Sequence, residues 1–490
     1  MTMTTTREAF VDAASRYDVV PVITEVLADR ETPVTVFEKL VGDRDGFLLE
    51  SVEGGEQWAR WSFIGWDPEF TLVATNGVTT AEGAAVDLPD GDPLSVLEEV
   101  LATITAAPLE GDAPPLHAGA VGYLAYDAVR YVERLPGGPT DDRGLPEMVW
   151  QFVGRLAVFD RYRQTVLLIR NVFQPTDPDS AFDAALADLD DDAARLGVET
   201  AHAVAARPDF GVAPAYRANM TQAGYEAAVR RSIEYVEAGD VFQVVPSLRL
   251  EVDFTGDPFA AYRALRLVNP SPFLFFIRHG DVAIVGSSPE LMTRARDGIA
   301  TSRPIAGTRP RGATPAEDDA FEAELLADPK ERAEHVMLVD LARNDLGRVC
   351  EFGSVVVDEL MVIERYSHVM HIVSGVTGKL RPDVGPVDVL RATFPHGTVS
   401  GAPKVRAMEV IDELEPTARG PYAGAVGYLD FSGNVDTAIA LRTLVISAGK
   451  AWVQAGAGVV ADSDPTAEYE ECLNKAAAAL SALAAAGQLA

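Results

Sequence analysis

The sequence contains only two cysteines, Cys350 and Cys472, among 490 residues. Two cysteines cannot build a disulfide framework, so we expect a reducing, cytoplasmic location. Residues 1–10 lack the apolar core of a signal peptide, and no stretch approaches the roughly 20 apolar residues that span a bilayer. These absences argue against a disulfide-rich secreted protein and against a helical membrane protein.

Basic residues are also scarce, because Lys and Arg total 41 against 74 Asp and Glu, a formal charge of −33. No long basic run is present to release counterions from phosphates, which argues against nucleic acid and against an anionic membrane surface. An acidic protein that receives an anionic substrate needs local cations or a metal ion. The candidate cations are Arg309, Arg311, Arg442 and Lys475.

The composition, 48% hydrophobic and 23% charged, is that of a folded globular protein with ample length for a large core. Strand-like segments bounded by Gly and Pro occur at 47–52, 61–64, 69–74, 118–126 and 166–172. They define a first block, residues 18–173. The stretch 174–220, rich in Asp, Ala and Pro, is the expected linker, with one amphipathic helix marked by Phe182, Leu186, Leu189, Ala193 and Leu196.

The second block, residues 221–487, begins with a helix that Thr221 caps and that has Tyr225, Val229, Ile233 and Val236 on one face. A strand is expected at 241–252, and the Ala-rich segment 476–486 is expected to be a terminal packing helix. Strands and helices alternate irregularly without a G-x-G-x-x-G motif, which predicts an α+β fold rather than a doubly wound parallel sheet.

Two acidic pairs, Glu331 with Glu334 and Glu468 with Glu471, stand at i, i+3 in segments that are predicted to be helical. This spacing places both carboxylates of a pair on one helical face. Hard divalent cations, magnesium in particular, take oxygen ligands and keep positions open for an anionic substrate. The pairs therefore suggest one metal site, the alternative being solvent-facing acids on surface helices.

Five segments in the second block occur in an order that resembles the chorismate-utilising enzymes. They are PIAGTRPRG at 304–312, DPKERAEH at 328–335, GTVSGAPK at 397–404, QAGAG at 454–458 and EYEECLNK at 468–475. FLLES at 47–51 and NPSP at 269–272 resemble the tryptophan-binding elements of anthranilate synthase component I. The resemblance implies a large antiparallel β-sandwich-like core flanked by helices, with an N-terminal α/β subdomain that carries the tryptophan site.

The resemblance also implies roles for individual residues. Magnesium would be held by Glu334 and Glu471, with Glu331 and Glu468 in support, and Glu290 would protonate the departing C4 hydroxyl of chorismate. The other expected catalytic residues are His371, Gln243 and Thr398. Chorismate would contact Gly307, Thr308, Tyr422, Arg442, Gly456, Ala457, Gly458 and Lys475, and the inhibitor tryptophan would contact Glu50, Ser51, Pro272, Phe273, Leu274 and Gly433.

Two positions bear on the reaction type. Gln243 stands where water-adding members use a lysine base, and Ala306 stands where aminodeoxychorismate synthases often carry a lysine nucleophile. An amide cannot deprotonate water and a methyl group cannot form a covalent intermediate, so ammonia is the expected nucleophile. The expected products are anthranilate and pyruvate, with ammonia supplied by a separate glutamine amidotransferase subunit because no activated cysteine is encoded.

Two alternatives stay open. The chain could stop at the amino intermediate or make an isochorismate- or salicylate-type product, or it could be a non-catalytic, tryptophan-responsive subunit. Two departures from the family pattern also stand out. Phe273 and Leu274 occupy positions where many relatives have Tyr and Met, and His396 precedes Gly397 where a small residue is common. The sequence assigns no role to His396.

Overall fold

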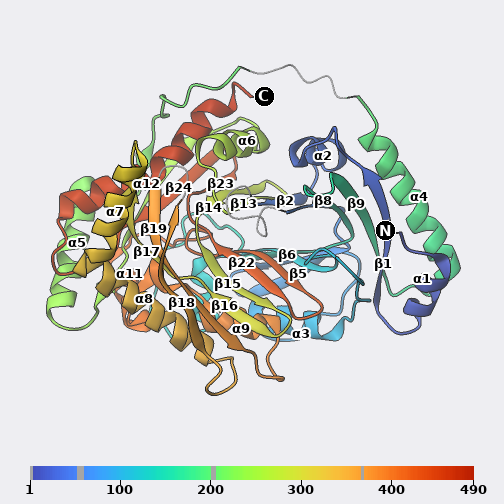
Figure 1. The fold of residues 1–490 in the computed structure, drawn as a ribbon, viewed down its shortest axis with the longest axis horizontal. Coiled ribbons are helices and arrows are strands. Elements are labelled where there is room, and N and C mark those ends of the chain that lie inside the picture. The colour runs from blue at the N-terminus through green and yellow to red at the C-terminus, as the bar shows by residue number, and fades with distance from the viewer. Residues whose placement is uncertain (1–3, 52–59, 200–205, 366–368, 490) are drawn as a thin grey trace.

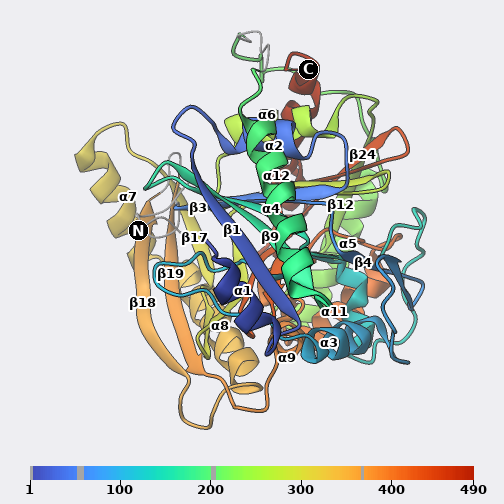
Figure 2. The same cartoon turned by 90° about the vertical axis from the view of Figure 1, so that its right-hand side faces the viewer.

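The computed structural model describes residues 4–51, 60–199, 206–365 and 369–489. Within these ranges two large sheets face each other and helices cover both outer faces (Figures 1 and 2). The ladders between neighbouring strands are antiparallel in both sheets. The predicted α+β fold with an antiparallel, sandwich-like core is therefore confirmed.

The first sheet contains, in spatial order, β1 (Val19–Leu27), β9 (Thr165–Phe173), β8 (Arg155–Asp160), β3 (Trp61–Trp66), β2 (Gly46–Glu50), β13 (Phe273–His279), β14 (Val282–Ser288), β23 (Thr443–Ser447), β24 (Lys450–Gly456), β12 (Ser247–Asp253) and β10 (Arg217–Ala218). Five of the six strand segments expected from the sequence appear here or in the second sheet with shifted ends. Val52, the expected end of one of them, lies outside the described residues.

The second sheet contains β17 (Ile305–Pro310), β19 (Val369–Lys379), β16 (Ile299–Ser302), β15 (Leu291–Arg296), β22 (Val435–Ile439), β21 (Ala425–Asp430), β6 (Gly119–Leu124), β7 (Met148–Phe152), β4 (Phe70–Thr75) and β5 (Val78–Gly83), with β18 (Val356–Arg365) also paired to β19. The two halves of the chain meet in both sheets, at β2–β13 in the first and at β6–β21 in the second. The blocks expected at 18–173 and 221–487 therefore share both sheets.

The helices form the outer layers. Against the first sheet lie α1 (Arg7–Ala14), α2 (Pro33–Leu40), α4 (Pro178–Leu196), α5 (Gln222–Glu237), α6 (Pro258–Val268) and α12 (Pro465–Ala486). Against the second lie α3 (Pro93–Thr103), α8 (Pro329–Gly347) and α9 (Pro386–Thr393). The remaining helices are the 3₁₀ turn η1 (Tyr126–Tyr131), α7 (Pro315–Ala327), α10 (Gly397–Ser400) and α11 (Lys404–Leu414).

The amphipathic patterns found in the sequence correspond to real helices. The Thr221 side chain accepts the Gly224 N–H at the start of α5, and Phe182 and Leu189 of α4 are buried in the core. The helix α4 packs across β1 and β9 in the segment expected to be a linker, as Figure 2 shows. The Ala-rich segment forms the buried end of α12. None of the helices in the described ranges is long and apolar enough to cross a membrane.

The single strand expected at 241–252 is wrong, because the structure has β11 (Gln243–Val244) and β12 (Ser247–Asp253) with a break between them. β11 pairs with β20 (Gly401–Ala402), whereas β12 joins the first sheet beside β24. Pro246 stands at the break and has no N–H to donate to a ladder. Its carbonyl accepts instead from the Tyr225 hydroxyl at 3.1 Å and the Ala457 N–H at 3.3 Å.

A buried ion pair fixes this break to the loop that carries α10. Glu415 and Arg419 are 4% and 1% exposed, and the Arg419 Nη2 lies 2.6 Å from Glu415 Oε1. The guanidinium also donates to the carbonyls of Val399 at 2.8 Å and Val245 at 2.6 Å. Glu415 in turn accepts from the backbone N–H and the hydroxyl of Ser247, each at 2.8 Å. One ion pair thereby holds three separate segments together.

We expect Arg419→Ala to lower the free energy of unfolding by roughly 3–5 kcal/mol, because it leaves the buried Glu415 carboxylate without its cation. Arg343→Ala removes an exposed pair, in which Arg343 and Asp340 are 54% and 80% exposed, and should cost less than about 1 kcal/mol. Urea unfolding followed by fluorescence checks both. Equal losses for the two variants would contradict a structural role for the buried pair.

Candidate active site

Both acidic pairs lie on helices, as the spacing predicts. Asp328 caps α8 by accepting the Lys330 and Glu331 N–H groups, and Asp464 caps α12 by accepting those of Thr466 and Ala467. These caps place each pair in the first two turns of its helix, where the helix dipole favours negative charge.

Each acid has a different neighbour. Glu331 faces Arg309 at 3.2 Å, Glu471 pairs with Lys475 at 2.7 Å, and the Gln243 amide donates to Glu334 Oε1 at 3.1 Å.

The same two lysines influence the pKa of one acid in each pair. Burial raises the pKa of Glu334, and the like charge of Glu331 raises it further, while Lys330 and Lys475 lower it. Burial likewise raises the pKa of Glu468, and the same two lysines act on it. Because Lys330 is on α8 and Lys475 is on α12, the acids of the two helices share one electrostatic environment.

The donor set fits a hard divalent cation. Glu334 and Glu468 are carboxylates whose ionised forms are destabilised by burial, and a cation would relieve that cost. Among the described residues no three His, Cys, Asp or Glu side chains lie close enough together to hold a metal by themselves. Magnesium commonly takes only one or two protein carboxylates and completes its shell with water and substrate oxygens. The two acidic pairs meet that requirement.

Glu290 follows β14 and is 6% exposed. Burial raises the pKa of its carboxyl to about 8, against the opposing effects of the Thr398 hydroxyl and of Lys475. Its Oε1 atom is buried and has no hydrogen-bond partner within the described part of the chain. At neutral pH this carboxyl is protonated, which is the state a general acid requires.

His371 on β19 lies opposite Thr308 of β17 in the ladder. Its Nδ1 is 3.1 Å from the Gly307 carbonyl oxygen and 3.1 Å from Thr308 Oγ1. Since a carbonyl only accepts, Nδ1 carries the proton and Nε2 has a lone pair. Burial lowers the pKa of His371, so the ring is neutral.

Gly307 allows a close approach between β17 and α8. Its φ is +69°, and a Cβ there would lie 3.1 Å from Glu331 Oε2 and 3.0 Å from Leu325 Cδ1. A side chain at this position would be strained and would also crowd the acidic pair. The glycine of the PIAGT segment therefore brings Thr308 and His371 beside the acids of α8.

The residues of the C-terminal third that are expected to contact the substrate come together only in part. Lys475 donates to the Gly456 carbonyl at 2.9 Å, and a Cβ on Gly458 would lie 2.5 Å from Gln243 Nε2, so these residues do come together. The Gly456 N–H, however, faces the buried Tyr422 hydroxyl, and the Ala457 N–H donates to Pro246. Both amides are engaged within the protein rather than pointing together at an anion.

The four candidate cations have different partners in the structure. Arg309 is bound by Glu324, Asp328 and Glu331, and Arg311 by Asp318. Arg442, with φ +48° between β22 and β23, donates to Asn269 Oδ1 at 3.1 Å. Lys475 alone among these four acts on Glu290, Glu334 and Glu468 together.

The family model for the chorismate binding enzyme matches residues 46–481. The chain belongs to the chorismate binding enzyme family. The anthranilate synthase component 1 of Mycolicibacterium smegmatis is 50% identical over 502 aligned residues, covering 99% of this chain and 95% of that protein. Those of Acetivibrio thermocellus and Pseudomonas aeruginosa are 45% and 46% identical over 97% and 98% of this chain, with 97% and 99% of those proteins covered. The resemblance to anthranilate synthase component I is confirmed.

Solved structures agree with this assignment. Anthranilate synthase component I from Streptococcus pneumoniae TIGR4 superposes with a TM-score of 0.78 at 35% identity, covering 93% of this chain and 99% of that one. MenF, the menaquinone-specific isochorismate synthase of Escherichia coli, gives a TM-score of 0.69 at 19% identity, covering 97% and 98%. The second likeness shows that this chorismate binding enzyme shares its fold with MenF.

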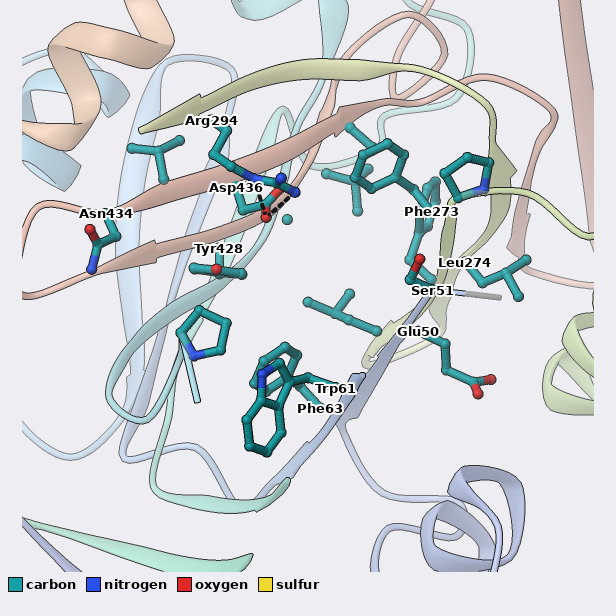
Figure 3. Close-up of a pocket in the computed structure, with 18 of the residues that line it drawn as sticks. Glu50, Ser51, Trp61, Phe63, Phe273, Leu274, Arg294, Tyr428, Asn434 and Asp436 are labelled. Atoms are coloured by element: carbon teal, nitrogen blue, oxygen red, sulfur yellow. Dashed lines mark hydrogen bonds and ion pairs between the residues drawn. The ribbon is translucent and has the colours of Figure 1, made fainter. Parts of the chain in front are cut away.

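This chorismate binding enzyme has a cavity of about 260 Å³ between the two sheets (Figure 3). It lies at the β2–β13 junction, where the two halves of the chain meet. Five of the six residues expected to contact tryptophan line it, namely Glu50, Ser51, Pro272, Phe273 and Leu274. Gly433 does not line it, although its neighbour Asn434 does.

The expected role of Glu50 in this cavity is not supported by its geometry. Its carboxylate points away from the cavity in Figure 3 and accepts from the Tyr262 hydroxyl at 2.6 Å, from Arg161 at 2.6 Å and from Arg266 at 3.1 Å. A carboxylate that already has three partners holds β2 in place rather than receiving an amino group.

Sequence reasoning missed several walls of the cavity. Trp61, Phe63 and Tyr428 supply aromatic surface, and the Arg294–Asp436 ion pair, at 2.6 Å, forms one side. Trp61 and Phe63 are two residues apart in a strand that the sequence predicts, so their side chains lie on the same face of the sheet. The sequence pattern contained that signal, but only the pairing of β3 with β2 shows which face meets the cavity.

We expect Glu290→Gln to stabilise the folded protein increasingly as the pH rises from about 4.5 to about 8. The unfolded Glu290 ionises near its ordinary pKa of 4.5, whereas the folded one holds its proton up to about 8, so the wild type loses stability over that window. The relative gain should reach about 5 kcal/mol at most and then level off.

Thermal unfolding of both proteins at pH 5, 7 and 9 measures this difference. A constant difference at the three pH values would show that Glu290 ionises normally in the fold.

Proposed function

We propose that this chain is the component 1 subunit of an anthranilate synthase in tryptophan biosynthesis, a magnesium-dependent lyase that converts chorismate and ammonia to anthranilate and pyruvate. One observation carries the proposal beyond family membership. Lys475, which pairs with Glu471, acts electrostatically on Glu290, Glu334 and Glu468, so one lysine couples the protonated acid to carboxylates of both helices. A dicarboxylate substrate that must lose a hydroxyl group needs this combination.

In the first stage ammonia forms a bond to C2 of chorismate while the C4–O bond breaks, and the C4 oxygen leaves as water with the proton of Glu290. The added nitrogen then gives up a proton, which restores the acid through solvent. General acid catalysis of this type contributes about 10²–10⁴-fold. The buried, protonated state of Glu290 supports this role.

In the second stage the aminodeoxyisochorismate intermediate loses the C2 hydrogen and the enolpyruvyl group, which departs as pyruvate, and the ring becomes aromatic. The neutral His371, whose Nδ1 proton is held by the Gly307 carbonyl, has its lone pair on Nε2, the atom that would take the C2 proton. Thr308, on the paired strand, helps to orient that imidazole.

Glu334 and Glu471, with Glu331 and Glu468 nearby, would hold the magnesium ion that this family implies. When bound, the ion would neutralise a substrate carboxylate and polarise it. Lys475, one of the two lysines that act on these acids, is already partnered by Glu471 and by the Gly456 carbonyl. Arg442, whose charge acts on His371, would supply a further positive charge for a dianionic substrate.

Ammonia is favoured over water as the nucleophile. Gln243 is 4% exposed and its amide donates to Glu334, and an amide cannot act as a base. Ala306, on β17, offers no nucleophile. Isochorismate formation would require the base that Gln243 cannot provide, and aminodeoxychorismate formation would require the nucleophile that Ala306 lacks. The remaining alternative is arrest at the amino intermediate.

The ammonia is proposed to come from a glutamine amidotransferase partner, with free ammonium as a substitute. Both cysteines are free and buried, and burial raises the pKa of Cys472 to about 12 and that of Cys350 above its ordinary value. Neither thiol is activated for glutamine hydrolysis. Two free thiols also support a reducing, cytoplasmic location.

Tryptophan is the proposed inhibitor, bound in the cavity at the β2–β13 junction. The cavity offers the aromatic rings of Trp61, Phe63 and Tyr428 to an indole, and Ser51 at the end of β2 lines it as well. The cavity size suits one amino acid side chain rather than a nucleotide.

Purified protein with chorismate, magnesium and ammonium at alkaline pH should produce anthranilate fluorescence. Glu334→Gln and Glu471→Gln should each lower turnover by at least roughly 100-fold, because each removes a charged metal ligand. Asp340→Asn, on the exposed face of the same helix α8 as Glu334, is the matched control and should keep the wild-type rate. Near-normal rates for both glutamate variants would refute the metal assignment.

Tryptophan should inhibit that reaction, and Phe273→Ala should weaken the inhibition by about 10-fold or more, because the ring lines the cavity. Leu267→Ala, on the exposed side of α6, is the control, since Leu267 is 51% exposed and away from the cavity lining. Dose–response curves with isothermal titration calorimetry provide the measurement. Unchanged activity at saturating tryptophan would remove the inhibitor assignment.

A further inference from the structure

His396 occupies a buried position beside the proposed general acid. Its side chain is 5% exposed, and its Nδ1 lies 2.9 Å from Thr398 Oγ1, 3.4 Å from the Thr398 N–H nitrogen and 3.6 Å from Glu290 Oε1. The imidazole caps α10, and the peptide that follows it leads directly to Thr398. A histidine that only filled space would not need to aim one nitrogen at both Thr398 and Glu290.

The hydrogen atoms in this cluster can be assigned. The Thr398 N–H can only donate, so the Nδ1 atom of His396 carries a lone pair and the ring proton is on Nε2. The Thr398 hydroxyl has one hydrogen and two candidate acceptors, the His396 Nδ1 at 2.9 Å and the Glu290 carboxyl. Because His396 Nδ1 carries a lone pair and lies within hydrogen-bond distance of the Thr398 oxygen, we assign that hydrogen to His396.

We propose that His396 is a positioning residue: its Nδ1 takes the Thr398 hydroxyl hydrogen, which turns the Thr398 oxygen lone pairs toward Glu290 and favours the protonated carboxyl. The chain of donation then runs from Glu290 to Thr398 to His396. The inference rests on the proposed function, because it concerns the acid that releases the C4 oxygen. Without His396, the Thr398 hydrogen would be free to stabilise the Glu290 carboxylate.

The charges around the cluster are compatible with this arrangement. Burial and the charge of Lys404 lower the pKa of His396 to about 3, so the ring stays neutral and keeps one proton, which the Thr398 N–H contact places on Nε2. Lys404, on α11, is itself paired with the buried Asp345 of α8 at 2.7 Å. Lys475 of α12 is the cation that acts on Glu290 and opposes its protonation. The neutral histidine therefore opposes the effect of Lys475, which favours the ionised Glu290 carboxylate.

The test is the protonation midpoint of Glu290 in the intact protein, read by infrared difference spectroscopy as the loss of the carboxylic acid band that Glu290→Gln abolishes. His396→Ala should move this midpoint to lower pH by about one pH unit, since a freed hydroxyl donor favours the ionised carboxyl. His396→Asn, whose side-chain oxygen can take the place of Nδ1 and cap α10, should restore most of the wild-type midpoint. His396→Gln fills the ring volume without an acceptor at Nδ1 and replaces the alanine variant should that one fail to fold.

The role of Thr398 makes the proposal specific. In a Thr398→Val background, His396→Ala should no longer move the midpoint, because no hydroxyl is left to redirect. The alkaline limb of the ammonia-dependent rate, corrected for the fraction of free ammonia, should follow the same pattern. An unchanged midpoint in the single variants, or a shift that persists without the Thr398 hydroxyl, would overturn the proposal. A shifted midpoint in a protein that makes no anthranilate would support the positioning role and refute the proposed function instead.

Discussion

The arrangement of the site depends on the buried ion pair between Glu415 and Arg419. The guanidinium binds the carbonyls of Val399 and Val245, and the carboxylate binds the N–H and the hydroxyl of Ser247, so the pair connects segments that carry site residues. Thr398 precedes Val399, and Gln243 lies two residues before Val245. Hydrophobic packing alone would leave these irregular segments free to slide, because it has no direction. Charge-assisted hydrogen bonds in a dry interior do have direction, and they fix the loop between β11 and β12 against α10.

The two sites of the molecule are linked by strand register. Leu274 pairs with Glu50 across the junction of the two halves, and Phe273 pairs with Ser288 in the next strand along. Glu290 follows Ser288 by two residues, so β13, which lines the cavity, also fixes the position of β14 and of the proposed general acid that follows it. A ligand that changes the packing of β13 acts on the backbone that carries Glu290, with no need for a change in the overall fold. This placement gives the proposed inhibitor cavity, where the two halves of the chain meet, a route to the backbone of Glu290.

Local patterns in the sequence predicted what local forces decide. The i, i+3 acids, the Thr221 cap and the Ala-rich helix all appear as expected, because helix spacing and capping are short-range effects. The break at Pro246 was missed because the apolar run on both sides of it reads as one strand, and only the buried ion pair and the pairing of β11 with β20 reveal two. The direction of the Glu50 side chain could not be predicted, since Arg161, Tyr262 and Arg266 are distant in sequence. The same holds for His396, whose partner Glu290 is 106 positions away.

The excess of negative charge raises the question of how a dianionic substrate can bind at all. Of the four cations expected to receive it, Arg309 and Arg311 are neutralised by acids of α7 and α8, and Arg442 is held by the neutral Asn269. Only Lys475 faces the acids of both helices, and it is matched by Glu471. The acids Glu334 and Glu468, whose ionised forms are destabilised by burial, attract a divalent cation. A divalent cation held by these acids would attract the substrate carboxylates, and by linkage the substrate would favour cation binding, so the acidic pairs would assist an anionic substrate rather than exclude it.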